Sequence, residues 1–265
     1  MKQKIALVLS GGGARGTAHI GVIEELIERG YEISSLAGTS MGALVGGIYG
    51  MGKLNEFKNW ICSLDRMKVF NLIDFTLGHQ GLIKAEKVLN TMKEFTGDAN
   101  IEDLPIPYAA VAADLKNREE VVFKSGSLYH AIRASIAIPS VITPVKTKDG
   151  LLVDGGIMNN IPVNHVVRHD GDLLVVVNVN ASIPILHPKK SEEKKTEDLK
   201  QYQIKLKEFQ AHLLKINPLN KDQKFSYLDL VGESINLMIH QIGQLHLEHY
   251  TPDVLIEISR DACDI

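Results

Sequence analysis

The sequence predicts an α/β protein whose parallel strands are joined by helical crossovers. Two observations in its first fifty residues lead to this class. A continuous apolar run at 5–9 is typical of a strand buried on both faces of a sheet, and 33–37 is a second short apolar run. Each run is followed by a glycine-containing loop and then by a stretch with helical spacing. This strand–loop–helix order, repeated twice, implies parallel strands.

The first two helices are expected directly after these loops. Between Ile20 and Ile27, apolar residues recur at helical spacing, and Gly30 provides a stop, which predicts a helix at 18–29. The second strand leads into a helix of small residues at 41–51. Both helices are therefore crossovers that begin at a loop beyond a strand.

Further elements follow along the chain. Strands are expected at 108–113, 119–123, 151–154, 173–179 and 254–258, and a helix at 128–136. The run at 173–179 is the clearest buried strand because it is continuous and rich in β-branched residues. A turn at 114–118 separates the first two of these strands, and a helix is expected before the last one.

Composition limits the classes of protein that the chain can represent. Its 265 residues, 45% apolar and 23% charged, suit one globular domain over 1–265. A net charge of -3 argues against a general nucleic-acid binder. The two cysteines lie far apart, and the first apolar run is too short for a secretory signal or a membrane span. We therefore expect a cytoplasmic protein.

Two segments have an unusual composition. Lysine and glutamate alternate through much of 187–207, inside a polar segment at about 187–226, which predicts a solvated loop or an exposed helix start. The alternative is contact between these lysines and anionic lipid head groups. The segment 57–81 is rich in large apolar residues, including Phe75 and Leu77. It is either a helix that packs on the sheet or a lid over an acyl pocket or membrane surface.

The first loop carries Gly11, Gly12, Gly13, Arg15 and Gly16, which fit the dinucleotide pattern GxGxxG. A dinucleotide site also needs a carboxylate at the end of the second strand, and none stands at 36–38. Consecutive N–H groups near a helix start, unobstructed by side chains, can instead hold a negative oxygen. The loop therefore suits a developing oxyanion, and the remaining alternative is a structural turn.

The second loop carries the pattern GxSxG at Gly38, Ser40 and Gly42. Between a strand and a helix, this pattern forces the serine into a strained and exposed position. The helix start adds its positive end, and the N–H of Met41 can join the oxyanion site. Ser40 is therefore the predicted nucleophile.

A serine hydroxyl needs a base, and Asp154 is the candidate. Only two strands precede Ser40, which does not fit the topology of α/β-hydrolases with their Ser–Asp–His order. Asp154 stands at a strand end before Gly155 and Gly156, which permit a tight turn into a cleft. Burial can raise the pKa of an aspartate until it accepts the serine proton directly. The alternative is that Asp154 only caps a turn.

The ten histidines raise the alternative of a Ser–His–Asp triad. His19, His165 and His169 lie nearest to the motifs, but we expect packing or surface roles for them. His246 and His249 could share a face of the C-terminal helix and ligate a metal. Glu248 would point elsewhere on that helix, so no metal site is predicted.

Together, the motifs SGGGARG, GTSMG and DGG, with the block RASIAIP at 133–139, resemble the patatin-like phospholipase family, specifically its compact bacterial members. The resemblance covers about 4–179. It implies a three-layer α/β/α sandwich with a mainly parallel central sheet, and substrates that are acyl esters of lipids. It also implies a Ser40–Asp154 dyad, with oxyanion N–H groups from Gly11, Gly12 and Gly13 and with Arg15 near the glycine loop. Many plant and animal relatives have alanine where this chain has Gly156, which leaves the role of the aspartate intact.

The sequence thus predicts a serine acyl-hydrolase that acts through an acyl-enzyme and needs no metal or cofactor. Its expected partner is a lipid or acyl-ester substrate, and peripheral contact with the inner face of a membrane is also expected. Nucleic acid is not an expected partner. A lipid-binding or regulatory protein on the same fold is one alternative, although both dyad residues are present. A nucleotide-binding oxidoreductase is the other, already weakened by the missing ribose carboxylate.

Overall fold

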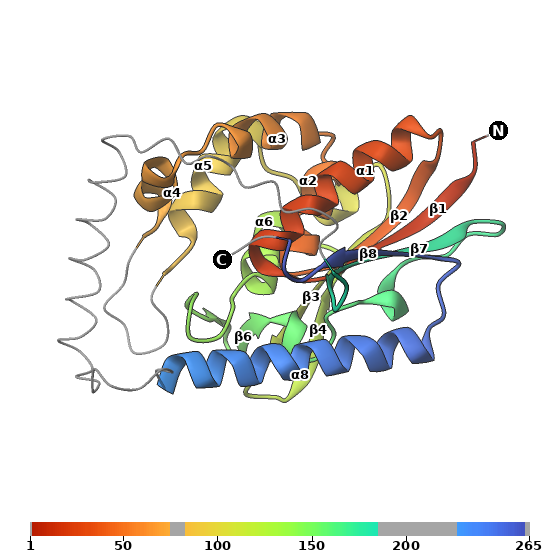
Figure 1. The fold of residues 1–265 in the computed structure, drawn as a ribbon. Coiled ribbons are helices and arrows are strands. Elements are labelled where there is room, and N and C mark those ends of the chain that lie inside the picture. The colour runs from red at the N-terminus through yellow and green to blue at the C-terminus, as the bar shows by residue number, and fades with distance from the viewer. Residues whose placement is uncertain (1, 75–82, 185–226, 263–265) are drawn as a thin grey trace.

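The computed structural model describes residues 2–74, 83–184 and 227–262. Within these residues, eight strands form one sheet in the order β5-β6-β3-β2-β1-β7-β8, and β4 pairs with β3 (Figure 1). The strands are β1 (Lys4–Leu9), β2 (Glu32–Thr39), β3 (Tyr108–Asp114), β4 (Glu119–Phe123), β5 (Val145–Lys146), β6 (Leu151–Asp154), β7 (Leu173–Ala181) and β8 (Val254–Ser259). The helices are α1 (Ala18–Glu28), α2 (Met41–Gly50), α3 (Leu54–Cys62), α4 (Arg66–Leu72), α5 (Glu86–Thr96), α6 (Leu128–Ser135) and α8 (Tyr227–His249).

The sheet is parallel through its centre and antiparallel at one end. β1 pairs in parallel with β2 and β7, β2 with β3, and β7 with β8. β3 pairs in antiparallel fashion with both β4 and β6, and β6 with β5. The strands predicted from the apolar runs are all present. The mainly parallel sheet of an α/β fold is confirmed.

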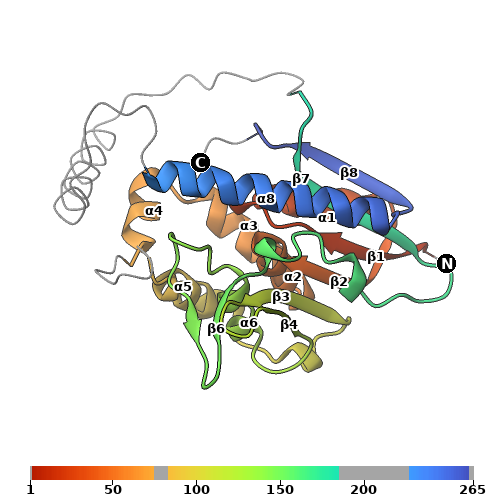
Figure 2. The ribbon, with the colours of Figure 1, turned by 90° about the horizontal axis from the view of Figure 1, so that it is seen from below.

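Helices cover both faces of the sheet. Figures 1 and 2 show α1, α2 and α3 on one side and α8 along the other. β1 explains this layering, because its side chains alternate between the faces. Leu7 and Leu9 belong to the core beneath the first group of helices, whereas Val8 belongs to a second core that includes Ile161 and contacts Leu247 of α8.

The apolar segment at 57–81 is only partly described. Phe57 of α3 is buried in the core, and Trp60 packs with ring centroids 6.0 Å from Phe57 and 5.5 Å from Phe95. This part of the segment therefore packs as an ordinary helix does. Phe75 and Leu77, which the lid hypothesis singled out, lie outside the described residues, as does the whole polar segment at 187–226.

The C-terminal helix and strand are present as α8 and β8. α8 spans 23 residues, yet no helix in the described part of the chain is both long and apolar enough to cross a bilayer. α8 instead lies along the sheet (Figure 2). This position brings its middle turns close to the loop that follows β6.

Candidate active site

Ser40 stands between β2 and α2 in a strained backbone conformation. Its φ of 55° and ψ of -124° lie in a region that residues other than glycine rarely adopt. The flanking glycines make the turn possible. A Cβ on Gly42 would lie 2.3 Å from the carbonyl oxygen of Leu9, and one on Gly38 would lie 2.5 Å from the carbonyl carbon of Gly42. The pattern GxSxG thus follows from close backbone packing against the end of β1.

Asp154 meets Ser40 directly. The Oγ of Ser40 lies 2.5 Å from Oδ2 of Asp154, and the two residues are only 5% and 6% exposed. Asp154 is the last residue of β6, and its N–H donates to the carbonyl of Ala137 at 2.9 Å. Its Oδ1 accepts the N–H of Gly156 at 2.8 Å. Both carboxylate oxygens are therefore oriented, one by the turn and one by the serine.

Burial shapes the acidity of Asp154. Removing the carboxylate from water raises its pKa from 3.8 to about 6, while the hydrogen bonds from Ser40 and Gly156 act in the opposite direction. At neutral pH this side chain is still largely ionised, but it binds a proton much more readily than an exposed aspartate. A carboxylate in this state can act as a general base.

The glycine loop lies against Ser40. A Cβ on Gly11 would lie 3.2 Å from the Cβ of Ser40 and 2.4 Å from Oδ1 of Asn160. The N–H of Gly11 donates to the carbonyl of Asn160 at 3.0 Å, and its carbonyl accepts from Nδ2 of Asn180 at 2.6 Å. Gly11 was expected to offer its N–H to an oxyanion, and here that group already has a partner. Gly11 is instead needed because a side chain at this position would collide with Asn160.

Three other N–H groups stand at helix starts near this loop. They belong to Gly12, which precedes the 3-10 helix Gly13–Thr17, to Gly13, which begins it, and to Met41, the first residue of α2. The first N–H groups of a helix have no partner within that helix, so they can hold an anionic oxygen. A Cβ on Gly16 would lie 2.5 Å from the Cβ of Met41, which shows how closely this 3-10 helix packs against the start of α2.

Arg15 supports the loop from outside. Its Nη2 donates to Oδ1 of Asn180 at 3.1 Å, and its Nη1 donates to the carbonyl of Arg260 at 3.3 Å. Asn180 in turn donates to the carbonyl of Gly11. Arg15 thus ties the glycine loop to the ends of β7 and β8.

Two contacts of the nucleophile turn were not anticipated from the sequence. The N–H of Ser40 donates to Oγ of Ser135 at 2.8 Å, and Oγ1 of Thr39 donates to the carbonyl of Asn159 at 2.8 Å. Ser135 belongs to the block RASIAIP, one of the motifs that carry the family resemblance. Membership of that block was the signal in the sequence that could have pointed to Ser135. Asn159 and Asn160 follow the DGG turn, but nothing in their local sequence indicated partners in distant loops.

The histidines stand apart from the dyad. His19 is fully buried, its Nε2–H donates to the carbonyl of Ser10 at 2.8 Å, and burial lowers its pKa to about 4, so it is neutral. His165 lies 3.0 Å from Glu120, and His246 and His249 pack edge-on against the ring of Tyr250. In the described part of the chain, no histidine hydrogen-bonds to Ser40 or Asp154, and the side-chain partner of Ser40 Oγ there is Asp154.

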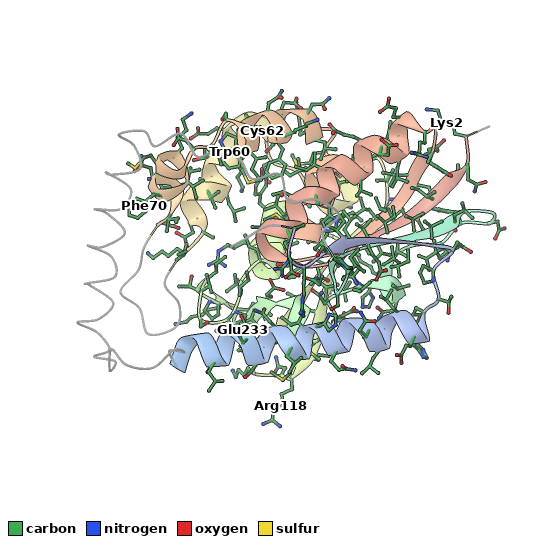
Figure 3. All side chains as sticks on the ribbon, viewed as in Figure 1. Lys2, Trp60, Cys62, Phe70, Arg118 and Glu233 are labelled. Atoms are coloured by element: carbon green, nitrogen blue, oxygen red, sulfur yellow. The ribbon has the colours of Figure 1, made fainter. Side chains whose placement is uncertain are left out.

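A cavity of about 430 Å³ lies beside the glycine loop, between α8 and the ends of β7 and β8. Glu233, labelled in Figure 3, contributes to it from α8, together with His240 and Ile239. The Cδ1 of Ile239 lies 3.7 Å from where a Cβ on Gly156 would stand. The cavity is therefore adjacent to the turn that carries Asp154.

A family model described as patatin-like phospholipase matches residues 7–167, which is more than half of the chain and includes both Ser40 and Asp154. The chain therefore belongs to the patatin-like phospholipase family. Its α/β fold is the fold of this family, as the motifs predicted.

Relatives come from bacteria and eukaryotes. An NTE family protein of Mycobacterium bovis is 47% identical over 179 residues, which are 68% of this chain and 50% of that protein. A lysophospholipase of Kluyveromyces lactis is 31% identical over 68% of this chain and 13% of its own length. The chain thus spans half the length of its mycobacterial relative and far less of the yeast one. Among solved structures, VipD of Legionella pneumophila aligns with a TM-score of 0.44 and 16% identity, over 85% of this chain and 57% of VipD.

Proposed function

We propose that the protein is a serine acyl-hydrolase that cleaves carboxylic esters of lipids, with Ser40 as nucleophile and Asp154 as base. The observation that carries this proposal is the 2.5 Å contact between Ser40 Oγ and Asp154 Oδ2, made in a buried site by a serine with φ of 55°. A strained serine held against a carboxylate of raised pKa is an arrangement suited to nucleophilic catalysis. The family supports the reaction class, since it is a family of patatin-like phospholipases.

The first half of the reaction forms an acyl-enzyme. Asp154 accepts the hydroxyl proton as Ser40 Oγ attacks the ester carbonyl carbon. The negative oxygen of the tetrahedral intermediate is held by N–H groups that we assign to Gly12, Gly13 and Met41, because these begin helices and Gly11 is already bonded. The protonated Asp154 then passes its proton to the leaving alcohol as the ester bond breaks.

The second half releases the acid. Asp154 takes a proton from water, which attacks the acyl carbonyl of Ser40, and the same N–H groups hold the second oxyanion. Collapse of this intermediate returns the proton to Ser40 Oγ and frees the carboxylic acid. One carboxylate thus serves both halves, which requires a pKa between those of the serine and a free aspartate, as the value of about 6 provides.

A lipid ester is the substrate class that we assign. One relative is named a lysophospholipase. The cavity next to the DGG turn has a mixed lining, with Leu237 and Ile239 beside Asn236 and His240. Such a lining suits a molecule with both an apolar and a polar part. We place the approach of the substrate along this cavity.

Contact with a membrane surface belongs to the same proposal, because a lipid substrate is presented there. Four large apolar side chains of α8 are exposed: Leu230, Leu237, Met238 and Leu245. An exposed apolar helix face is typical of interfacial binding. Replacing Leu237 and Met238 together by serine should reduce co-sedimentation with phospholipid vesicles, and unchanged binding would remove the membrane part of the proposal.

The test of the function compares wild type with Ser40→Ala and Asp154→Asn on p-nitrophenyl butyrate and on a lysophospholipid. We expect turnover by wild type and at least a 1,000-fold loss in both variants, on the order seen for single members of serine catalytic sites. Asp114→Asn is the matched control, because Asp114 is equally buried at the end of β3 but accepts the backbone N–H groups of Lys116 in its own turn and of Leu151 at the start of β6. It should keep its turnover. Folded wild type that hydrolyses no ester would contradict the proposal.

A further inference from the structure

Ser135 holds the backbone of the nucleophile. Its Oγ accepts the N–H of Ser40 at 2.8 Å and donates to the carbonyl of Val111 at 2.5 Å, and its side chain is fully buried. A hydroxyl has one proton to donate, and here it is donated in the hydrogen bond to the carbonyl of Val111. The lone pairs of Ser135 are therefore directed at the N–H of Ser40, and the direction of both bonds is fixed.

The place of Ser135 in the fold links it to the second dyad residue. Ser135 is the last residue of α6, and two positions later the carbonyl of Ala137 accepts the N–H of Asp154 at 2.9 Å. Val111 itself is paired with Thr39, the residue before the nucleophile. One short segment at the end of α6 thus contacts the backbones of both Ser40 and Asp154, which lie 114 positions apart in the sequence.

The bond also has a chemical consequence. A backbone held at φ of 55° relaxes unless its surroundings fix it. The N–H of Ser40 is the group through which Ser135 fixes that turn. Since this N–H points at Ser135, it is not a donor to the oxyanion, which leaves that task to the N–H groups of neighbouring residues.

On the basis of the function proposed above, we propose that Ser135 is a positioning residue, which holds Ser40 in the reactive conformation through the nucleophile's own N–H. Removing its hydroxyl leaves a buried donor unpaired at the nucleophile turn. Small displacements of a catalytic group cost up to about 100-fold in rate. Ser135→Ala should therefore lower kcat by about 10- to 100-fold. It should leave KM within about twofold, because Ser135 does not reach the substrate.

Ser35→Ala is the matched control. Ser35 is also a fully buried serine, it lies on β2 like the nucleophile turn, and its Oγ donates to the carbonyl of Val167 away from the dyad. Both variants should lose a similar amount of thermal stability, but only Ser135→Ala should lose turnover and react more slowly with a fluorophosphonate. Its pH–rate profile should keep the acid limb of wild type, because Asp154 is untouched.

A second variant keeps the test decisive if Ser135→Ala does not fold. Ser135→Cys keeps a side-chain donor but is a weaker acceptor, so its kcat should fall below that of Ser35→Ala, and a kcat equal to that of Ser35→Ala would overturn the positioning role. Equal kcat for Ser135→Ala and Ser35→Ala would overturn the positioning role and leave Ser135 a core hydrogen bond. Failure of the proposed function is seen separately, as absence of turnover in wild type or full turnover in Ser40→Ala.

Discussion

Replacing Asp154 by asparagine should abolish turnover and yet stabilise the fold at neutral pH. The folded protein raises the pKa of this carboxyl from 3.8 to about 6, so the folded state binds its proton more tightly than the unfolded chain does. The stability that this proton provides is fully present below pH 3.8 and is lost as the pH rises to about 6. The loss amounts to about 3 kcal/mol, because each of roughly two pKa units is worth about 1.4 kcal/mol.

Asparagine removes the charge and keeps the shape. Its Oδ1 can accept the N–H of Gly156, and its Nδ2 can donate to Ser40 Oγ, so both contacts of the wild-type side chain have a counterpart. At pH 8, Asp154→Asn should therefore exceed wild type in unfolding free energy by about 3 kcal/mol, or about 6 °C in Tm for a chain of this size. Near pH 4 the two proteins should unfold alike.

Urea unfolding at pH 4 and pH 8 measures this difference. Asp114→Asn serves as the control of opposite sign, because hydrogen bonds from the N–H groups of Leu151 and Lys116 lower the pKa of Asp114. That variant should be less stable than wild type at pH 8 and at pH 4 alike, because the folded pKa of Asp114 lies below 3.8 and the deficit shrinks only when the pH falls through it. Equal stability of wild type and Asp154→Asn at pH 8 would refute the reasoning from burial.

Three further predictions follow from the same geometry. The kcat/KM of wild type on a neutral ester should fall tenfold per unit below about pH 6, because protonated Asp154 cannot accept the serine proton; a rate that stays flat to pH 4 would contradict this. Gly42→Ala should prevent folding or cost on the order of 3 kcal/mol or more, since its Cβ would stand 2.3 Å from the carbonyl oxygen of Leu9, and circular dichroism with thermal melting measures it. Gly232→Ala, in α8 with no described atom within 4 Å of its Cβ, should instead stabilise by about 0.5–1 kcal/mol in the same melt.

The buried strands could be predicted because their sequences leave few alternatives. The run 173–179 is continuous and β-branched, and β7 covers it between β1 and β8. The glycine motifs were equally informative, because each demands a close backbone approach that the structure contains. The antiparallel pairing of β3 with β4 and β6 was not predicted, since short strands do not encode which neighbour they meet.

The residues of the candidate site could be predicted from the sequence only in part, for a related reason. Ser40 and Asp154 stand in local sequence patterns that predict a turn, and the fold brings the two side chains together. The contact of Ser135 with Ser40 joins residues 95 positions apart, and a serine at a helix end carries no local mark of so distant a partner. The hydrogen bond from the N–H of Gly11 to the carbonyl of Asn160 could not be predicted either, because it depends on where the backbone of Asn160 passes. Sequence therefore indicated that Ser40 and Asp154 belong to one site, but not the residues that hold them there.

The central claim is that Ser40 attacks the substrate, and peptide mass spectrometry after fluorophosphonate labelling tests it most directly. Wild type and Asp154→Asn would be incubated with the probe for matched times, digested and mapped. We expect one adduct, on the peptide that contains Ser40, in wild type, and labelling slowed by at least 100-fold in Asp154→Asn, where no base takes the proton. An adduct on any other residue, or equal labelling of both proteins, would contradict the Ser40–Asp154 dyad.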